Sequence, residues 1–390
     1  MAPTRRTASL KPAPGSLWSP HRGDKGEELQ TTREINPGEC IVSEKPLLEL
    51  PPIPSDVIDR DQLLRAKGSR EGKPVANGIK MVKEQVKNMD KQPREALRKL
   101  HGPAARNERQ GSPSESDMLI ISKNVFTHED TPNMSNLRVY RIISRINHSC
   151  RPNAIVEWNP SKGEGTLHAL RKIAAGEEIT IDYLCHPEDT LNSISERRKL
   201  LEEQYDFVCT CPACGHDPKE PTTYRGAEMR LEREAAITDQ ISRRRAGTLY
   251  AQIDFDEEVP IEFDRDQITD SDIRWRTAQL GYLDEYIDAL KELGLRDHKL
   301  VLAYERRAAF MEMGAALAEV KKGRPKPYQK LKVALPKESY EHFLKLAKEE
   351  WEKALKLHWR CDGVDHPDSK YAHKKRDELA QKLLPFEQDL

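Results

Sequence analysis

Residues 145–154 read Arg-Ile-Asn-His-Ser-Cys-Arg-Pro-Asn-Ala, and this stretch decides the expected fold together with two that follow it. The second, residues 176–183, reads Gly-Glu-Glu-Ile-Thr-Ile-Asp-Tyr. The third, residues 205–215, reads Tyr-Asp-Phe-Val-Cys-Thr-Cys-Pro-Ala-Cys-Gly. An Asn-His-Ser-Cys tetrapeptide alone would be weak evidence of any fold. The order of the three stretches along one chain is a much stronger signal.

The segments around these stretches have the alternation of strands. Ile179 and Ile181 are two residues apart, so a strand puts both on one face. The same pattern predicts further strands at residues 40–42, 47–50, 118–126, 154–158 and 165–170. The cluster Pro51-Pro52-Ile53-Pro54 should end the second of these, because proline cannot donate to a sheet ladder.

Beyond Pro221 the pattern changes to that of long helices. Residues 340–355 carry one apolar stripe at three- and four-residue spacing, which indicates an amphipathic helix. Comparable stripes run through residues 227–245, 273–293, 298–320 and 368–384. We therefore expect an all-helical C-terminal domain at 221–390, whose paired helices could stack as a TPR-like array.

Residues 55–115 interrupt the strand-rich part with short helical patterns. From Arg60 to Gln110 there are 14 Lys and Arg against 6 Asp and Glu, an excess of eight positive charges. Two interpretations stay open for this basic helical insert. It is either a solvated surface or a contact surface for an acidic partner such as DNA or a nucleosome.

Composition narrows the class of protein. The 390 residues carry a net charge of −1, which excludes a wholly basic nucleic-acid coat. No apolar run is long enough for a transmembrane helix, and no apolar core follows the basic residues of 1–22, so we expect a disordered tail there and no secretory signal. The expected location is the nucleus, the cytoplasm or both, with no membrane contact.

Seven cysteines in such a chain are more typical of reduced thiols or metal ligands than of disulfides. Cys209, Cys211 and Cys214 can present three thiols to one ion, because an extended chain places the first two on one side and a tight turn returns the third. A structural zinc ion needs four such ligands. The alternative is a redox pair of Cys211 and Cys214, which the third cysteine and the following Gly215 disfavour.

At these residues the chain resembles the SET-domain protein lysine methyltransferases, including their post-SET zinc segment. The resemblance covers about residues 20–215, with a SET domain at 23–184 and a post-SET segment at 185–220. It implies an α+β fold, a β-rich SET domain followed by helices. The wider arrangement is similar to fungal SET-and-MYND relatives, but no cysteine lies between Cys40 and Cys150, so the MYND finger is missing.

The resemblance also implies site residues. It assigns S-adenosylmethionine to Gly26, Glu27, Asn124, Asn147, His148, Tyr183 and Phe207. It makes Cys150 the fourth ligand of a structural zinc ion, with Cys209, Cys211 and Cys214. Tyr140 and Tyr205 are further candidates for the lysine channel.

The resemblance makes Tyr183 the catalytic candidate. A lysine side chain has an ordinary pKa of about 10.4 and must lose its proton before its amine can attack the methyl group. A narrow channel can desolvate that amine, and a tyrosine hydroxyl at its end can hold it in line with the methyl donor. The predicted activity is methylation of protein lysines, with histones among the expected substrates.

One departure from the family's sequence pattern supports a different hypothesis about function. The family has Gly-x-Gly where this chain reads Gly26-Glu27-Glu28, and the second glycine lets the backbone approach the cofactor without a Cβ. Glu28 could displace that turn, or point away while its amide still binds. The alternative function is therefore a catalytically weak SET-fold scaffold that binds chromatin or partner proteins.

Overall fold

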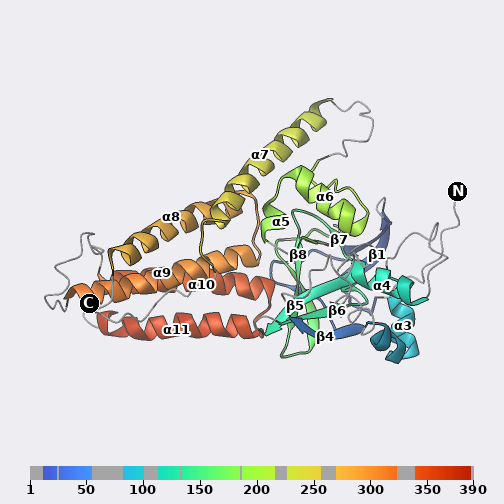
Figure 1. Ribbon diagram of the computed structural model, residues 1–390, viewed down its shortest axis with the longest axis horizontal. Helices are drawn as coiled ribbons and strands as arrows, with labels where there is room; N and C mark the ends of the chain where they lie inside the picture. The colour runs from blue at the N-terminus through green and yellow to red at the C-terminus, as the bar shows by residue number, and fades with distance from the viewer. Residues whose placement is uncertain are drawn as a thin grey trace, which may run out of the picture. The chain divides into compact units, whose positions relative to one another are not determined.

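The structure is a computed structural model, and it describes residues 12–23, 26–54, 82–100, 113–131, 134–184, 187–215, 226–255, 269–322 and 339–387. The chain divides into two compact units. The first comprises Met1–Ile181 and Leu200–Val208, and the second comprises Asp182–Lys199 and Cys209–Leu390. The first is rich in strands and the second is helical, so the predicted α+β fold with a helical C-terminal region is confirmed (Figure 1).

In the part of the first unit that the structure describes, the strands form four small sheets. Its strands are β1 (Trp18–Gly23), β2 (Gly26–Thr31), β3 (Cys40–Glu44), β4 (Leu48–Pro54), β5 (Val125–Thr131), β6 (Met134–Val139), β7 (Asn147–His148), β8 (Ala154–Asn159), β9 (Glu164–Ala169) and β10 (Thr180–Ile181). The sheet orders are β1-β2, β10-β7, β3-β9-β8 and β4-β6-β5, with β10-β7 parallel and the others antiparallel. The predicted strands at 40–42, 154–158 and 165–170 are confirmed.

Two predictions near the N-terminus need correction. Trp18–Gly23 forms β1 and is not a disordered tail, because it pairs along its whole length with β2 and Trp18 is buried. Pro51–Pro54 also does not end β4. The register between β4 and β6 shifts between Leu50 and Ile53, and that irregularity absorbs the two prolines between them.

The strand predicted at 118–126 is wrong for most of its length. Residues Pro113–Asn124 form helix α4, and only Val125 begins β5. The apolar pair Ile120 and Ile121 satisfies both patterns over so short a run. In the fold both side chains are buried in one cluster with Leu48 and Leu50 of β4.

The described parts of the basic insert are helical and share that cluster. Residues 82–88 form a helix and α3 follows at Lys91–Leu97. Val82, Val86 and Leu97 are buried in the core cluster that contains Leu137 and Val139 of β6. The apolar side of residues 82–100 is therefore part of the first unit's core, while their charged side, with Lys83, Lys87 and Lys91, is exposed. Residues 55–81 and 101–112 of the predicted insert lie outside the described residues.

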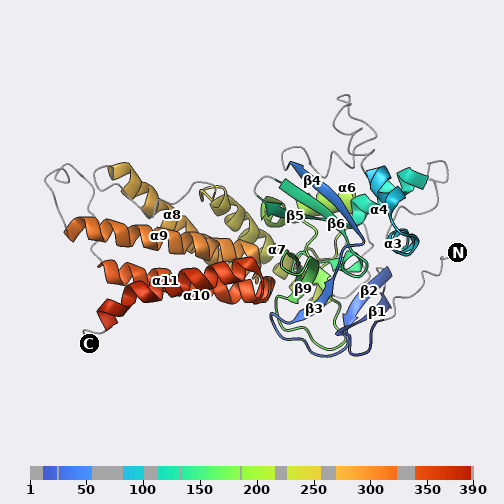
Figure 2. The ribbon, with the colours of Figure 1, turned by 90° about the horizontal axis from the view of Figure 1, so that it is seen from below.

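Helices build the second unit. They are α5 (Pro187–Leu191), α6 (Ile194–Tyr205, which continues into the first unit), α7 (Gly226–Tyr250), α8 (Asp270–Glu292), α9 (His298–Lys322), α10 (Tyr340–Cys361) and α11 (Pro367–Glu387). Helix α9 packs on α8 and α10, and α10 also packs on α11 (Figure 2). Each of the five long helices covers an apolar stripe that the sequence predicted. Thr269 caps α8 through a capping box, and Ser339 caps α10 by accepting from the His342 amide.

Among the described residues, no helix combines the length and the apolar character that a bilayer crossing requires.

Candidate active site

The two motif strands of the sequence lie side by side. Thr180 pairs with Asn147 and Ile181 pairs with His148 in the parallel β10-β7 ladder. The Ser149 amide donates to the Ile181 carbonyl at 2.9 Å, which extends the contact beyond the ladder. Backbone hydrogen bonds therefore hold residues 180–181 beside residues 147–149, although about thirty residues separate them in the sequence.

Asn153 holds these strands together, a role that the motifs did not predict. Its side chain is 1% exposed. Its Nδ2 donates to the Glu178 carbonyl at 2.8 Å, and its Oδ1 accepts from the Thr180 amide at 2.8 Å. A buried amide with both ends satisfied fixes the position of the strand that ends in β10. In the sequence, the one indication of this role is that Asn153 lies within the quoted 145–154 stretch.

Asn147 contacts the N-terminal turn of the predicted cofactor site. Its Nδ2 donates to Glu178 Oε1 at 2.8 Å and to the Glu27 carbonyl at 3.4 Å. The Glu27 carboxylate pairs with Arg145 Nη1 at 2.6 Å, and Arg145 Nη2 donates to the Lys99 carbonyl at 3.0 Å. Two of the predicted cofactor residues, Glu27 and Asn147, are thus brought together.

Arg145 fixes the Glu27 side chain by an ion pair. The sequence did not predict this role, because an arginine next to a motif is usually a surface residue. Only 10% of the Arg145 side chain is exposed. Burial lowers the pKa of the guanidinium, and the charge of Glu27 opposes that shift. The pair joins β2 to the 145–154 stretch.

Glu28, the departure from the family pattern, is held inside the first unit. The residue is 9% exposed, and Gln30 Nε2 donates to Glu28 Oε1 at 2.8 Å. Its backbone pairs with His21 in the regular β1-β2 ladder. The β2 strand therefore continues without interruption through the substituted position.

His148 of the Asn-His-Ser-Cys motif belongs to a small cluster of aromatic rings. The rings of His148 and Phe207 have centroids 6.1 Å apart, and those of Phe207 and Tyr205 are 6.4 Å apart. An ion pair joins Asp206 to Lys123 at the end of α4. Asp206 takes a left-handed backbone conformation, with φ of 62°. The structure thus brings the predicted residues His148 and Phe207 together.

Asn124 is fixed by contacts within its own region. It is 4% exposed, and its Nδ2 donates to the Ile120 carbonyl one helical turn back, at 2.7 Å. Its carbonyl accepts from the Ser144 hydroxyl at 2.8 Å. Its predicted contact with a cofactor stays a prediction. Tyr140 packs in the core: it is fully buried, and a Cβ added to Gly165 would come within 2.5 Å of its ring.

Tyr183 belongs to the second unit and is half-buried. It follows Ile181 by two residues, so covalent geometry keeps the two Cα atoms within about 7 Å of each other. Ile181 pairs with His148. Tyr183 therefore follows directly after the strand that pairs with the Asn-His-Ser-Cys motif.

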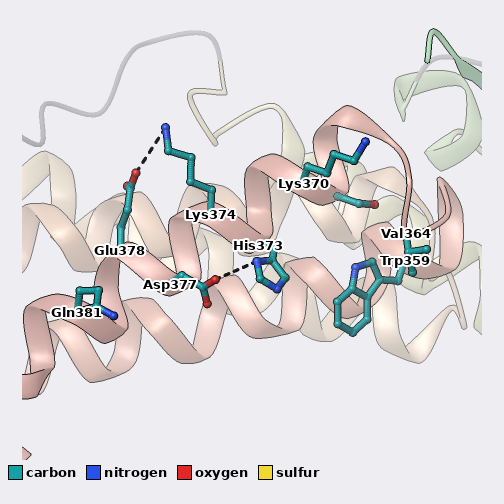
Figure 3. A pocket seen from close by; sticks show the side chains of 9 residues that line it. Trp359, Val364, Lys370, His373, Lys374, Asp377, Glu378 and Gln381 are labelled. Carbon is teal, nitrogen blue, oxygen red and sulfur yellow. Dashed lines mark ion pairs between the residues drawn. The ribbon is translucent and has the colours of Figure 1, made fainter.

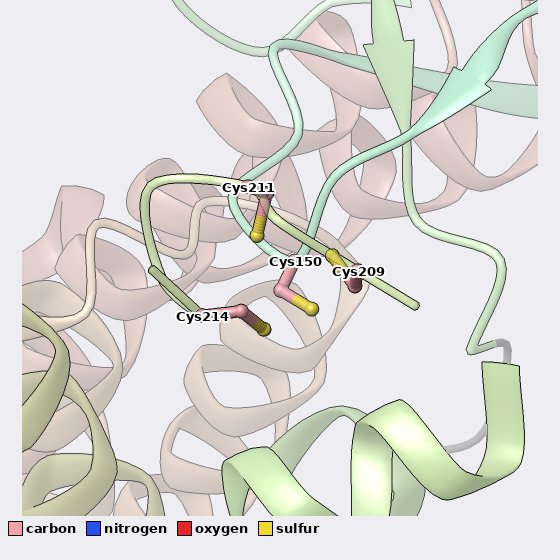
Figure 4. A group of neighbouring side chains, drawn as sticks. All are labelled: Cys150, Cys209, Cys211 and Cys214. Atoms are coloured by element: carbon pink, nitrogen blue, oxygen red, sulfur yellow. The ribbon is translucent and has the colours of Figure 1, made fainter. Parts of the chain in front are cut away.

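Three thiols of the second unit form a cluster that could hold a metal ion. Cys209, Cys211 and Cys214 are buried and reduced, and their sulfur atoms lie within 4.8 Å of one another (Figure 4, which also labels Cys150). The amides of Cys214 and Gly215 both donate to the Cys211 carbonyl at 2.9 Å, and Gly215 has a φ of +70°. The predicted tight turn is confirmed.

The donor set fits a zinc ion. Tetrahedral zinc thiolate sites have Zn–S distances of about 2.3 Å, which puts ligand sulfurs about 3.8 Å apart. The thiols are close enough to bind one ion without rearranging the backbone. Arg198 fixes that backbone, since its guanidinium donates to the carbonyls of Cys209 and Cys214 at 3.0 and 3.1 Å. Cys150, of the first unit, is also buried and reduced, and His148 Nε2 lies 3.2 Å from its sulfur.

A separate groove lies on α10 and α11 in the second unit (Figure 3). It is lined by Trp359, Val364, Ser369, Lys370, His373, Lys374, Asp377, Glu378 and Gln381. His373 pairs with Asp377 at 3.0 Å, and Lys374 with Glu378 at 3.7 Å. None of the predicted site residues lines it.

Comparisons with known proteins agree with the motif order. The family model described as "SET domain" matches residues 26–184. Histone-lysine N-methyltransferase SMYD3 of Homo sapiens is 33% identical over 162 residues, which are 42% of this chain and 36% of that protein. Histone-lysine N-methyltransferase set5 of Schizosaccharomyces pombe is 42% identical over 77 residues, 20% of this chain and 23% of that protein.

Protein-lysine N-trimethyltransferase SMYD5 of Gallus gallus is 38% identical over 109 residues, 27% of this chain and 25% of that protein. In each of these three matches the chain spans little more than a third, or less, of the relative's length. A solved structure, "Crystal structure of the SET domain of LSMT bound to Lysine and AdoHcy", aligns with 95% of this chain and 89% of that chain at 12% identity, with a TM-score of 0.27. A likeness that weak has no bearing on function.

Proposed function

This chain carries a SET domain homologous to those of the SMYD and fungal Set5 lysine methyltransferases, and we propose that it methylates protein lysines with S-adenosylmethionine as the methyl donor. The observation that supports this most is the parallel β10-β7 ladder. It joins Asn147 and His148 to the strand that runs directly into Asp182 and Tyr183, as the motif order of the family requires.

S-adenosylmethionine would be held by the corner where Gly26-Glu27 meets Asn147, together with His148, Asn124 and Phe207. When bound, the cofactor supplies an activated methyl group on a positively charged sulfur. The contacts that support this are the Asn147–Glu27 hydrogen bond and the ion pair of Arg145 with Glu27. Because the Glu28 carboxylate is held by Gln30, it has a partner other than the cofactor.

Tyr183 would orient the substrate amine and the methyl group. Its hydroxyl can accept a hydrogen bond from the substrate amine and so hold it in line with the methyl group. The resemblance gives Tyr205 and Phe207 as further residues of a lysine channel that would exclude water. Exclusion of water favours the neutral amine, which is the reactive form.

The metal proposal is one structural zinc ion held by Cys150, Cys209, Cys211 and Cys214. Three clustered thiols and their short spacing support it. The fourth assignment, Cys150, comes from the resemblance, and its burial as a reduced thiol supports it.

The substrates would be protein lysines, with histones as the first candidates, in the nucleus, the cytoplasm or both. The excess of positive charge in residues 60–110 supports a contact with DNA or nucleosomes. These finer assignments extend the proposal beyond methyl transfer itself.

Two measurements separate the enzyme from the scaffold hypothesis. Calorimetric titration of the purified chain with S-adenosylmethionine should show one saturable site. Incubation with labelled S-adenosylmethionine and cell extract should then place label on protein that yields methyl-lysine after acid hydrolysis. Absence of both binding and label would contradict the enzyme and favour the scaffold hypothesis.

A further inference from the structure

The residues on both sides of Tyr183 contact one buried hydroxyl, that of Thr190. The Thr190 Oγ1 atom lies 3.0 Å from Asp182 Oδ2 and 2.9 Å from the Leu184 carbonyl. Asp182 Oδ1 also accepts from the Leu184 amide at 2.9 Å. Thr190 is 0% exposed, so water cannot substitute for it without opening the turn. Both residues that flank Tyr183 are thus fixed to helix α5.

Thr190 is held in turn by helix α7. Its carbonyl accepts from Arg243 Nη1 at 2.6 Å, and Arg243 Nε donates to Asp239 Oδ2 at 2.6 Å. The side chains of Arg243 and Asp239 are both 0% exposed. They lie four residues apart on α7, so one helical turn presents both of them.

Arg197 connects the Asp239 carboxylate to the thiol cluster. Arg197 Nη2 lies 3.7 Å from Asp239 Oδ2 and 3.4 Å from Cys214 Sγ, and this guanidinium is also 0% exposed. Cys214, Arg197, Asp239, Arg243, Thr190 and Asp182 therefore form a continuous chain of contacts within the second unit, which we call the α5–α7 network. One end is a candidate zinc ligand, and the other is the neighbour of Tyr183.

Electrostatics make this network sensitive to the state of Cys214. Arg197 and Arg243 carry two positive charges and Asp239 carries one negative charge, all without exposure to solvent. Buried charges are stable only when they are paired. Zinc binds cysteine as the thiolate, and a charged acceptor strengthens the hydrogen bond that Arg197 donates. Metal binding would thus tighten the network at its cysteine end.

Lys299 adds a second charged contact at the other end. Burial alone would lower the pKa of the Lys299 ammonium, but the charges of Asp297 and Asp182 raise it above its usual value. Lys299 Nζ lies 2.8 Å from Asp297 Oδ2. The start of α9 therefore also faces the Asp182 carboxylate.

We propose that the α5–α7 network couples metal binding at the cysteine cluster to the position of Tyr183, with Thr190, Arg243, Asp239 and Arg197 as positioning residues. This inference rests on the proposed function, because it assigns a regulation to the same site. A metal-loaded cluster holds Arg197, Asp239 and Arg243 in place, and these hold α5, whose Thr190 fixes the turn that carries Tyr183.

Thr190→Val tests the coupling with little risk to the fold, since it replaces the hydroxyl with a methyl group of similar size and leaves the carbonyl that Arg243 contacts. The matched control is Thr277→Val, which removes a hydroxyl bonded to the Ile273 carbonyl within α8. The first readout is hydrogen exchange of peptides that contain Leu184, measured in the full chain with bound zinc and after chelation. It needs no activity and no substrate.

In the wild type and in Thr277→Val, chelation should speed exchange at Leu184 at least tenfold. In Thr190→Val, exchange should be fast already and change less than twofold on chelation. The same variant should lose at least tenfold in kcat while its KM for S-adenosylmethionine stays within twofold. A wild-type Leu184 amide that does not respond to zinc removal overturns the inference. So does an equal response in wild type and Thr190→Val. Absence of any methyl transfer by the wild type would instead overturn the proposed function, and the exchange result would still decide the coupling.

Discussion

Asn147 and Thr180 are partners in a two-residue parallel ladder, and this pairing joins the two motifs that carry the proposed chemistry. Such a short ladder contributes little by itself. Asn153 stabilises it from one side, and the Ile179 amide, which donates to the Leu29 carbonyl at 2.7 Å, ties the strand to β2. The proposed cofactor site is thus built at a junction of three segments far apart in the sequence.

The purified protein should contain about one equivalent of zinc. Cys211→Ser should lose most of it and should weaken S-adenosylmethionine binding, because metal binding and local folding are coupled. Cys361→Ser, a buried cysteine of α10 outside the cluster, is the matched control and should keep its zinc. Elemental analysis of reduced protein prepared without chelators measures both. A wild-type protein without zinc would contradict the metal site.

Arg145→Leu should weaken S-adenosylmethionine binding at least tenfold. The variant removes the ion pair that fixes the Glu27 side chain, and with it one of the contacts that position the Glu27 carbonyl against Asn147. Arg171→Leu is a suitable control, because it breaks a half-exposed ion pair with Glu177 in the same unit. Calorimetric titration compares the two. Equal affinities would exclude the Glu27 corner from the cofactor site.

The basic insert should bind an acidic partner in a salt-sensitive manner. Lys83, Lys87 and Lys91 are exposed, and their replacement by alanine should reduce affinity for DNA or nucleosomes and flatten its decrease between 50 and 200 mM salt, by about one unit of slope for each phosphate that is no longer neutralised. The control replaces Lys370, Lys374 and Lys382 of α11, which are also exposed. Binding curves by fluorescence anisotropy measure both sets. Identical curves for all three proteins would make the insert a solubilising surface only.

His358 should make the stability of the helical part depend on pH. Burial would lower the pKa of this imidazole, but hydrogen bonds to Asp362 at 2.6 Å and Glu305 at 2.9 Å raise it to about 9. His298 also donates to Asp362, which supports the same pair. A histidine with a raised pKa stabilises the fold fully below its unfolded pKa, near 6.5, and this contribution is lost as the pH rises through about 9.

Urea unfolding at pH 6 and pH 9.5 measures this effect, which should be on the order of 3 kcal/mol in the wild type. His358→Gln should remove most of the difference between the two pH values. The exposed His373 contacts only the surface side chains of Asp377 and Arg376 among the described residues, so His373→Gln should behave like the wild type. A wild-type stability that rises between pH 6 and 9.5 would contradict the raised pKa.

The extent of successful sequence prediction differs between the parts of the molecule. Strands β8 and β9 and the five long helices were predictable because each carries its own alternation or stripe. Helix α4 was not, because the Ile120-Ile121 pair fits a strand equally well and only its packing on β4 decides the outcome. Pro51 and Pro52 led to a wrong strand end for a similar reason, because the register shift between Leu50 and Ile53 accommodates them within β4.

Some residues of the candidate site could be predicted from the sequence, and others could not. Asn147, His148 and the cysteines stood in recognisable order, so the sequence could propose them. The α5–α7 network could not be foreseen, because Thr190, Arg197 and Arg243 come together only when α5, α6 and α7 pack. A buried arginine has no sequence signature that distinguishes it from the many surface arginines of a chain with 64 Lys and Arg.

The sharpest test of the proposed mechanism is methyl transfer by wild type and Tyr183→Phe, measured side by side. The variant keeps the ring, so the fold, the zinc content and most of the cofactor affinity should be retained. It removes the hydroxyl that would align the amine, and positioned groups of this kind contribute about 10²–10⁴ in rate. We expect label on protein lysines with the wild type and at least a hundredfold slower transfer with the variant, about 2.7 kcal/mol of barrier. Equal rates for the two proteins would contradict the assignment of Tyr183, and no transfer by either would contradict the enzyme.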